Sequence, residues 1–320
     1  MGNKIFGAVV LLLWGSSMAW LVGAKVLPNF FRGDPPRVAA SGRLEPAAWV
    51  IELQGANCGL SVSQAVPGDQ QTSEVHSRVI LKRLPLPQLG TQWLWMQPLL
   101  SDLHDLRLDV RTKTTFDTFG RLATFAARIK ANESATEARI LGRVSDGLLK
   151  LNLRAGSYKH QTEHPWTGRS MLGGELAPQS KLLAVYVGKR WREEVYSPLS
   201  APGAAAEVIE AEVTEEELLE YAGEITRVKR IVYRSVSAAG IAAQDRVRAI
   251  AWVRDDGQVI RQDVFVLNTR LRFTRLPELA ARELAESLLE LDKHASVTRP
   301  DTNRPDTTTA ERERAGEPSP

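Results

Sequence analysis

Residues 106–116 read Leu-Arg-Leu-Asp-Val-Arg-Thr-Lys-Thr-Thr-Phe, and every second residue is apolar or a threonine. Successive side chains of a β-strand point to opposite faces of the sheet. The pattern therefore predicts one long strand, with an apolar face toward a core and a charged face toward water.

Further alternating runs follow this strand, and turn sequences separate them. The next runs have their apolar residues at 123–129, 138–144 and 149–155, and Asp117-Thr-Phe-Gly120 and Ser145-Asp-Gly147 are turns. Near the C-terminus, 246–254 and 259–265 flank Asp255-Asp-Gly-Gln258, a strong hairpin signal, and 268–274 continue as a strand. Strands at hairpin spacing with no regular helix between them predict a mainly β, antiparallel fold and argue against parallel βαβ units.

An acidic block precedes a basic one in the C-terminal half. Residues 207–224 contain eight glutamates and no Lys or Arg, and Arg227, Lys229, Arg230 and Arg234 follow at once. We expect two neighbouring segments whose charged faces attract each other. Thr214 and Glu217 fit a capping box, which predicts a short helix ending at Gly223, with a strand as the open alternative.

Two other segments have helical character. Residues 5–24 form an uncharged apolar stretch between Lys4 and Lys25, long enough to span about 30 Å, which predicts a transmembrane anchor. A cleaved signal peptide is the alternative, because Val22-Gly-Ala24 resembles a cleavage site. After Pro277, the apolar spacing of 281–291 predicts an amphipathic helix that packs on the sheet.

The domain organisation follows from these segments. We expect an anchor or signal segment at 1–24, a Pro- and Gly-containing linker at 25–42 and a β-rich domain with its C-terminal helix at 43–293. Residues 294–320 are poor in large aliphatic side chains, which predicts a disordered tail. The excess of basic residues after the apolar segment favours a cytoplasmic C-terminal part by the positive-inside rule. Because an N-terminal apolar segment that follows a basic residue is the usual export signal, we instead expect a single-pass membrane protein with an extracytoplasmic, periplasmic main domain.

Composition excludes several classes of function. The chain has 320 residues with 41 Lys+Arg against 38 Asp+Glu, a net charge of +3, too small for binding nucleic acid through its phosphates. The single Cys58 excludes an intramolecular disulfide and cysteine-rich zinc modules, and we expect it to be buried as a small hydrophobic side chain. Phosphate-binding loops and nucleophile elbows are absent, so we expect no cofactor and favour a non-catalytic protein.

His160-Gln-Thr-Glu163-His164 satisfies the H-x-x-E-H signature of one class of zinc peptidases. That chemistry requires a helix, in which residues four apart lie about 6 Å from each other. The surrounding pattern favours an extended segment, in which the same residues are about 13 Å apart. We therefore treat His160, Glu163 and His164 as weak metal candidates and a zinc hydrolase as the least favoured function.

Trp93-Leu-Trp95-Met96 is an apolar, partly aromatic segment. Core packing is its simplest role. Because indole rings favour the boundary between water and lipid, Trp93, Trp95 and Met96 are also candidates for contact with an apolar ligand.

Several segments together resemble exported bacterial β-rich domains of unknown function. They are the apolar N-terminal segment, the 106–155 meander, Gly188-Lys-Arg-Trp191, the turn at 220–224 and the hairpin at 251–258. Some such domains resemble the curved half-barrel sheets of lipoprotein-localisation factors. The resemblance implies a curved, half-barrel-like sheet with an apolar concave side and a lipid or acyl ligand. This chain lacks the lipobox cysteine of the lipidated members, which argues against a role in lipoprotein trafficking.

The favoured function is a non-catalytic extracytoplasmic module that binds an apolar ligand, a lipid or an acyl chain, or a protein partner on the inner face of the sheet. The one-sided alternation from 106 to 155 is the basis of this hypothesis. The alternative is a structural subunit of an envelope assembly, in which the edges of the sheet contact partner proteins.

Overall fold

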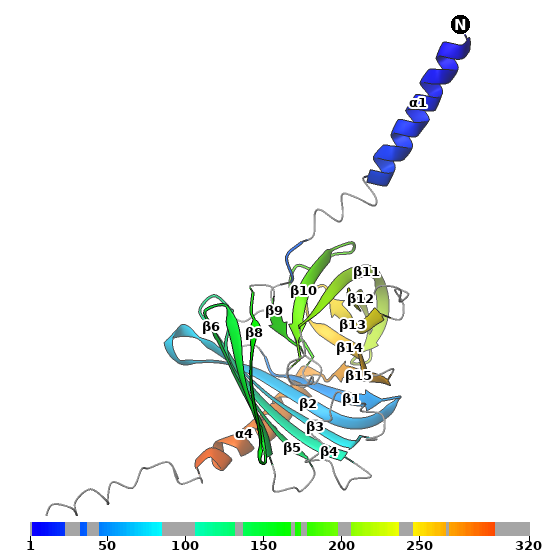
Figure 1. Cartoon of the computed structure of the whole chain (residues 1–320). Helices are drawn as coiled ribbons and strands as arrows, with labels where there is room; N and C mark the ends of the chain where they lie inside the picture. Colours follow the sequence, from blue (N-terminus) through cyan, green and yellow to red (C-terminus); the bar gives the residue numbers. More distant parts are fainter. Residues whose placement is uncertain are drawn as a thin grey trace, which may run out of the picture.

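A computed structural model describes residues 2–22, 33–36, 45–84, 106–131, 137–167, 170–173, 178–197, 206–236, 246–266 and 269–297. Fifteen strands in this part of the chain form one sheet, with a helix near each end of the sequence (Figure 1). The prediction of a mainly β, antiparallel fold is confirmed. Trp93, Trp95 and Met96 lie outside the described residues.

The sheet follows the chain almost in sequence order. Its spatial order is β8-β7-β6-β5-β4-β3-β2-β1-β15-β14-β13-β12-β11-β10-β9. All neighbouring strands are antiparallel except β9 and β10. The first half of the sheet consists of β8 (Tyr158–Pro165), β7 (Leu148–Ala155), β6 (Glu137–Ser145), β5 (Leu122–Ala131), β4 (Leu106–Phe116), β3 (Ser73–Leu84), β2 (Ala56–Pro67) and β1 (Ala47–Leu53). The second half consists of β15 (Thr269–Arg275), β14 (Val259–Val266), β13 (Val247–Arg254), β12 (Glu224–Ser235), β11 (Glu207–Tyr221), β10 (Arg190–Tyr196) and β9 (Ser170–Leu172). A short 3₁₀ helix, η2 (Asp69–Gln71), precedes β3.

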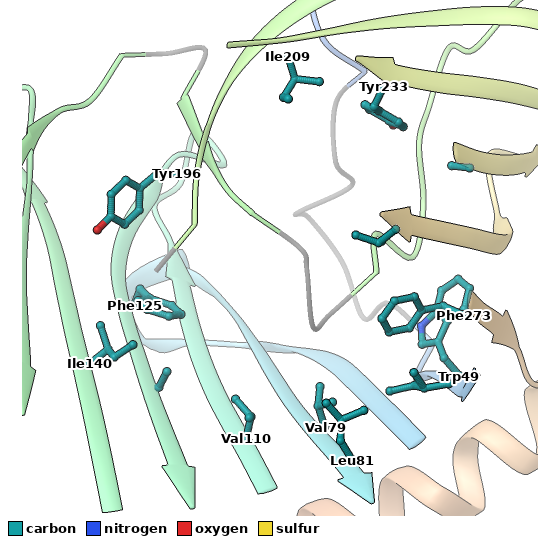
Figure 2. Packing of buried hydrophobic residues seen from close by; sticks show 14 of the residues in the cluster. Trp49, Val79, Leu81, Val110, Phe125, Ile140, Tyr196, Ile209, Tyr233 and Phe273 are labelled. Atoms are coloured by element: carbon teal, nitrogen blue, oxygen red, sulfur yellow. The ribbon is translucent and has the colours of Figure 1, made fainter. Parts of the chain in front are cut away.

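The two halves of the sheet meet where β1 pairs with β15, with Trp49 opposite Arg275. The halves bend toward each other, so that buried side chains from both converge on one interior (Figure 2). Val110, Phe125 and Ile140 come from the first half, and Ile209 and Tyr233 come from the second. One apolar core therefore runs along the inner face of the sheet.

The predicted meander is confirmed as β4 to β7. Val110 lies opposite Ile129, and both are nearly inaccessible to solvent. Ile140 lies opposite Leu153, and both side chains face the same core. The period-two pattern therefore identified both the strands and their inner face.

The predicted short helix at 214–223 is a strand, the alternative that the sequence left open. β11 runs without a break from Glu207 to Tyr221, with a bulge between Val213 and Glu215. Ion pairs between Arg230 and Glu215 (2.8 Å) and between Arg234 and Glu212 (3.2 Å) join it to β12. The cross-strand pairing of the acidic and basic blocks thus outweighs the local capping signal.

Helix α1 (Gly2–Leu21) covers most of the predicted anchor segment. Its apolar side chains are exposed, as at Leu12 and Trp20. Among the helices that the structure describes, none is both long enough and apolar enough to cross a membrane.

Helix α4 (Glu278–Val297) is the predicted amphipathic helix, and it extends four residues into the predicted tail. Ala281 and Ala285 are buried against Ala48 and Val62 on the outer face of β1 and β2. The small side chains allow the helix to lie close to the sheet. Residues 298–320 lie outside the described part.

An ion pair beneath α4 adds to this docking. The Arg78 guanidinium donates two hydrogen bonds to the Asp109 carboxylate, at 3.0 and 2.7 Å, and a third to the Leu288 carbonyl oxygen of α4 at 3.3 Å. Burial of Asp109 acts to raise its pKa, but the hydrogen bonds and charge of Arg78 hold the pKa below the ordinary value of 3.8.

Asp109→Asn is expected to lower the free energy of unfolding at pH 7 by about 2 kcal/mol, because it removes a charge-assisted pair and leaves Arg78 buried. Urea denaturation measures this loss, and hydrogen exchange should show faster exchange in α4. Since the carboxyl pKa is lowered by folding, the contribution is complete well above pH 3.8 and is lost as the pH falls through the folded-state pKa. Unchanged stability and exchange would contradict this role of the ion pair.

Candidate functional site

The H-x-x-E-H segment is strand β8. His160 and His164 lie opposite Leu153 and Leu149 of β7, so both imidazoles belong to the inner face. Glu163 is on the outer face, opposite Lys150, with a 4.0 Å ion pair. Strand alternation thus gives the three side chains no common face, and no group of three or more potential metal ligands occurs among the described residues.

The inner face becomes more accessible to solvent at β8. Leu149, Leu151 and Leu153 of β7 are buried, whereas His160 and His164 of β8 are partly exposed. Thr162 lies between the two histidines and its hydroxyl is 3.3 Å from His164 Nε2. The outermost strand therefore forms a polar margin beside an apolar surface.

This margin meets the other end of the sheet through side chains. The rings of His164 and Tyr196 of β10 are 4.7 Å apart. Burial lowers the pKa of His164 and raises that of Tyr196 to about 12, so both groups are neutral at pH 7. β8 and β9 are the two ends of the strand order, and they do not pair with each other. We call the line along which β8 faces β9 and β10 the seam.

Two polar atoms at the middle of the sheet are buried without a hydrogen-bond partner among the atoms of the structure. They are Trp49 Nε1 and Ser61 Oγ, and these two residues lie directly opposite each other on β1 and β2. Buried polar groups are almost always hydrogen bonded. Hydroxyls continue along the same face, where Ser77 and Thr112 hydrogen bond to each other. The inner face therefore combines apolar walls with a row of hydroxyl groups.

A buried carboxylic acid lies on the inner face of the second half. Glu193 of β10 accepts a hydrogen bond from Trp191 Nε1 at 3.1 Å. Burial raises the pKa of Glu193 to about 7, and the hydrogen bond from Trp191 opposes this rise only in part. The Tyr233 hydroxyl is fully buried nearby, and burial, together with the charge of Glu193, raises its pKa well above 10. Near pH 7, a large fraction of Glu193 is therefore protonated and uncharged.

Cys58 fits the expected role of a small buried side chain. Its thiol is buried, and burial raises its pKa to about 11. The reactive form of a cysteine is the thiolate, which is scarce at neutral pH when the pKa is that high. The geometry therefore favours packing over nucleophilic catalysis.

Some of these residues carried a signal in the sequence. In Arg190-Trp-Arg-Glu-Glu-Val-Tyr196, alternation places Glu193 on the same face as Trp191, which identifies an acid on an apolar face. The pairing of Trp49 with Ser61 depends on the register of two strands and has no local signal.

No protein-family model and no curated protein matches this chain. One solved structure with a related shape is the crystal structure of a beta-barrel-like protein of the domain of unknown function DUF1849 from Brucella abortus. The two chains share 11% identity with a TM-score of 0.45, over 74% of this chain and 98% of the other. A likeness at this level carries no argument about function.

Proposed function

We propose that this chain is a non-catalytic module that binds an apolar ligand, a lipid or an acyl chain, on the inner face of its half-barrel-like sheet. The observation that supports the proposal is one apolar face shared by both halves of the sheet, beside a seam where no described backbone hydrogen bond joins β8 to β9. An acyl chain gains about 0.8 kcal/mol for each CH₂ group that it buries, so an apolar wall alone favours such ligands.

The seam is the proposed route to this face. The inner residues of β5 to β7 are buried in the structure, so the ligand reaches them when His164 and Tyr196 separate. Side-chain contacts cost less to break than a ladder of backbone hydrogen bonds. The ligand's polar end is placed at the margin formed by His160 and Thr162, because His160 Nε2 is buried and has no hydrogen-bond partner among the described residues.

Thr162→Arg tests this route. A long cation at the partly exposed margin is expected to reduce binding of a fluorescent long-chain fatty acid at least about tenfold, because the acyl chain must pass a charged group. Fluorescence titration of the full chain in mild detergent measures the change, and circular dichroism checks the fold.

Leu141→Arg is the matched control, since Leu141 is exposed on β6, two strands from β8, and lies on the opposite, outer face. Equal loss of binding in both variants would contradict the proposed route. Failure of the unaltered chain to bind the fatty acid at all would contradict the proposed function.

We also propose that the chain acts at a membrane, with the main domain on the periplasmic side. The exposed apolar side chains of α1 support this localisation, because a helix that is apolar all round is stable when lipid or protein covers it. Protease accessibility on intact cells and after disruption tests it. Digestion of the main domain only after disruption of the inner membrane would contradict it.

A further inference from the structure

Strand β8 has an open edge. Within the described strands it pairs only with β7. That pairing runs without a shift in register from Ala155 opposite Tyr158 to Leu148 opposite Pro165. The free side of β8 faces β9 and β10 across the seam, where the rings of His164 and Tyr196 meet near the Pro165 end of the strand (Figure 1). Sheet edges are usually interrupted by bulges or covered, because a regular free edge pairs readily with another strand.

The backbone groups that face outward can be identified. Trp166 donates its N–H to the Gly147 carbonyl oxygen at 2.8 Å, in the same register as β7 and β8. Because direction alternates along a strand, the N–H and C=O groups of Lys159, Gln161 and Glu163 point away from β7. Pro165 is the next outward position and has no N–H, so the pairing edge ends there.

We propose that β8 pairs with β8 of a second copy of this chain, antiparallel and about a two-fold axis at Gln161. In this register Lys159 lies opposite Glu163 of the other copy, and the symmetry forms this oppositely charged pair twice. On the inner face, Tyr158 lies opposite His164 and His160 lies opposite Thr162. Each pair joins side chains of the same face, as antiparallel pairing requires.

The backbone supports the same register. The pairs 159–163, 161–161 and 163–159 join outward-facing residues, so each pair exchanges two N–H···O bonds, about six in all. Shifting the register by two residues places Lys159 opposite Gln161 or opposite Pro165, and either shift loses both ion pairs. Charge complementarity therefore selects one register and a copy of the same strand as the occupant.

Gln161→Cys in the full chain tests the axis directly. Two residues of a hydrogen-bonded pair have Cα atoms about 5.5 Å apart, within the range that a disulfide spans. Under mild oxidation in detergent we expect covalent dimers to form at least about tenfold faster than with Leu141→Cys, which is an exposed position on β6. Cys58 is buried and occurs in both variants.

A charge exchange tests the register. Lys159→Glu places like charges opposite each other twice and is expected to weaken dimerisation about tenfold, measured by analytical ultracentrifugation in detergent. Adding Glu163→Lys to that variant restores opposite charges and the dimer. Lys159 and Glu163 are exposed, so the fold is expected to tolerate both changes.

Four results would overturn the inference. The first two are a monomer at all concentrations and equal crosslinking in the two cysteine variants. The third is a dimer that Lys159→Glu leaves unchanged, as expected if α1 or another surface mediates association. The fourth is a crosslink from Gln161→Cys to a different protein, which would show that the edge receives another strand. None of these results depends on the binding of an apolar ligand.

Discussion

Replacing Glu193 with glutamine is expected to raise the free energy of unfolding at pH 8 by about 3 kcal/mol. Burial raises the pKa of Glu193 from 4.5 to about 7, so folding favours the protonated acid. Each pKa unit corresponds to about 1.4 kcal/mol, and the glutamine has no charge to bury. Its amide oxygen can still accept the hydrogen bond from Trp191 Nε1.

The sign of the pH dependence follows from the raised pKa. An acid that binds its proton more tightly in the folded state stabilises the fold fully below pH 4.5, and this stabilisation is lost as the pH rises to about 7. Urea denaturation at pH 5 and pH 8 should therefore show a difference between Glu193→Gln and the unaltered chain that is large at pH 8 and small at pH 5.

Glu194→Gln is the control, because Glu194 is the next residue, lies on the opposite face of β10 and accepts a hydrogen bond from Ser170 at 2.9 Å. It is expected to change stability by less than about 1 kcal/mol at either pH. If Glu193→Gln were less stable than the unaltered chain at pH 8, the fold would stabilise the carboxylate, and burial would not be the dominant influence on its pKa.

Gly59→Ala is expected to lower the free energy of unfolding by about 3 kcal/mol or more. A Cβ atom at this position would lie 2.2 Å from the carbonyl oxygen of Ile80 and 3.1 Å from Leu81 Cα. Both are backbone atoms of β3, so the β2–β3 ladder must shift to admit a methyl group. Thermal and urea unfolding measure the loss.

Gly142→Ala on β6 is the matched control. A Cβ atom added at Gly142 would meet the ends of the Leu151, Leu149 and Phe125 side chains at 3.0, 3.4 and 3.5 Å, and these side chains can move slightly. We expect a change within about 1 kcal/mol. Equal destabilisation by the two alanines would show that close approach of the backbone at Gly59 is not the cause.

Local patterns predicted the elements whose partners are close in sequence. Alternation identified β4 to β7, and Asp255-Asp-Gly-Gln258 identified the β13–β14 hairpin. The closure of the two halves was not predictable, because Trp49 of β1 pairs with Arg275 of β15, far along the chain, and no turn signal encodes that pairing.

The 214–223 segment shows where a local signal fails. Thr214 and Glu217 have the spacing of a helix cap, but Thr214 Oγ1 donates to the Arg230 carbonyl oxygen of β12, and Glu217 accepts from Trp252 Nε1 at 2.9 Å. The Thr214 hydroxyl and the Glu217 carboxylate, which would cap a helix, are thus hydrogen bonded to residues of β12 and β13 instead. Tertiary contacts therefore decide the conformation of this segment.

The candidate site was predicted in outline. The apolar inner face followed from alternation in 106–155, and the extended H-x-x-E-H segment followed from its strand-like surroundings. The seam between His164 and Tyr196 depends on how the sheet bends, which no short segment of sequence specifies. Binding of a lipid or acyl chain remains a proposal.

Native mass spectrometry of the full chain, released gently from detergent after purification from cells, is the sharpest test of ligand binding on the inner face. We expect a bound species with the mass of a lipid or fatty acid, which is retained by Leu141→Arg and depleted in Thr162→Arg. Detection of the ligand-free mass alone, before and after incubation with a long-chain fatty acid, would contradict the proposed function.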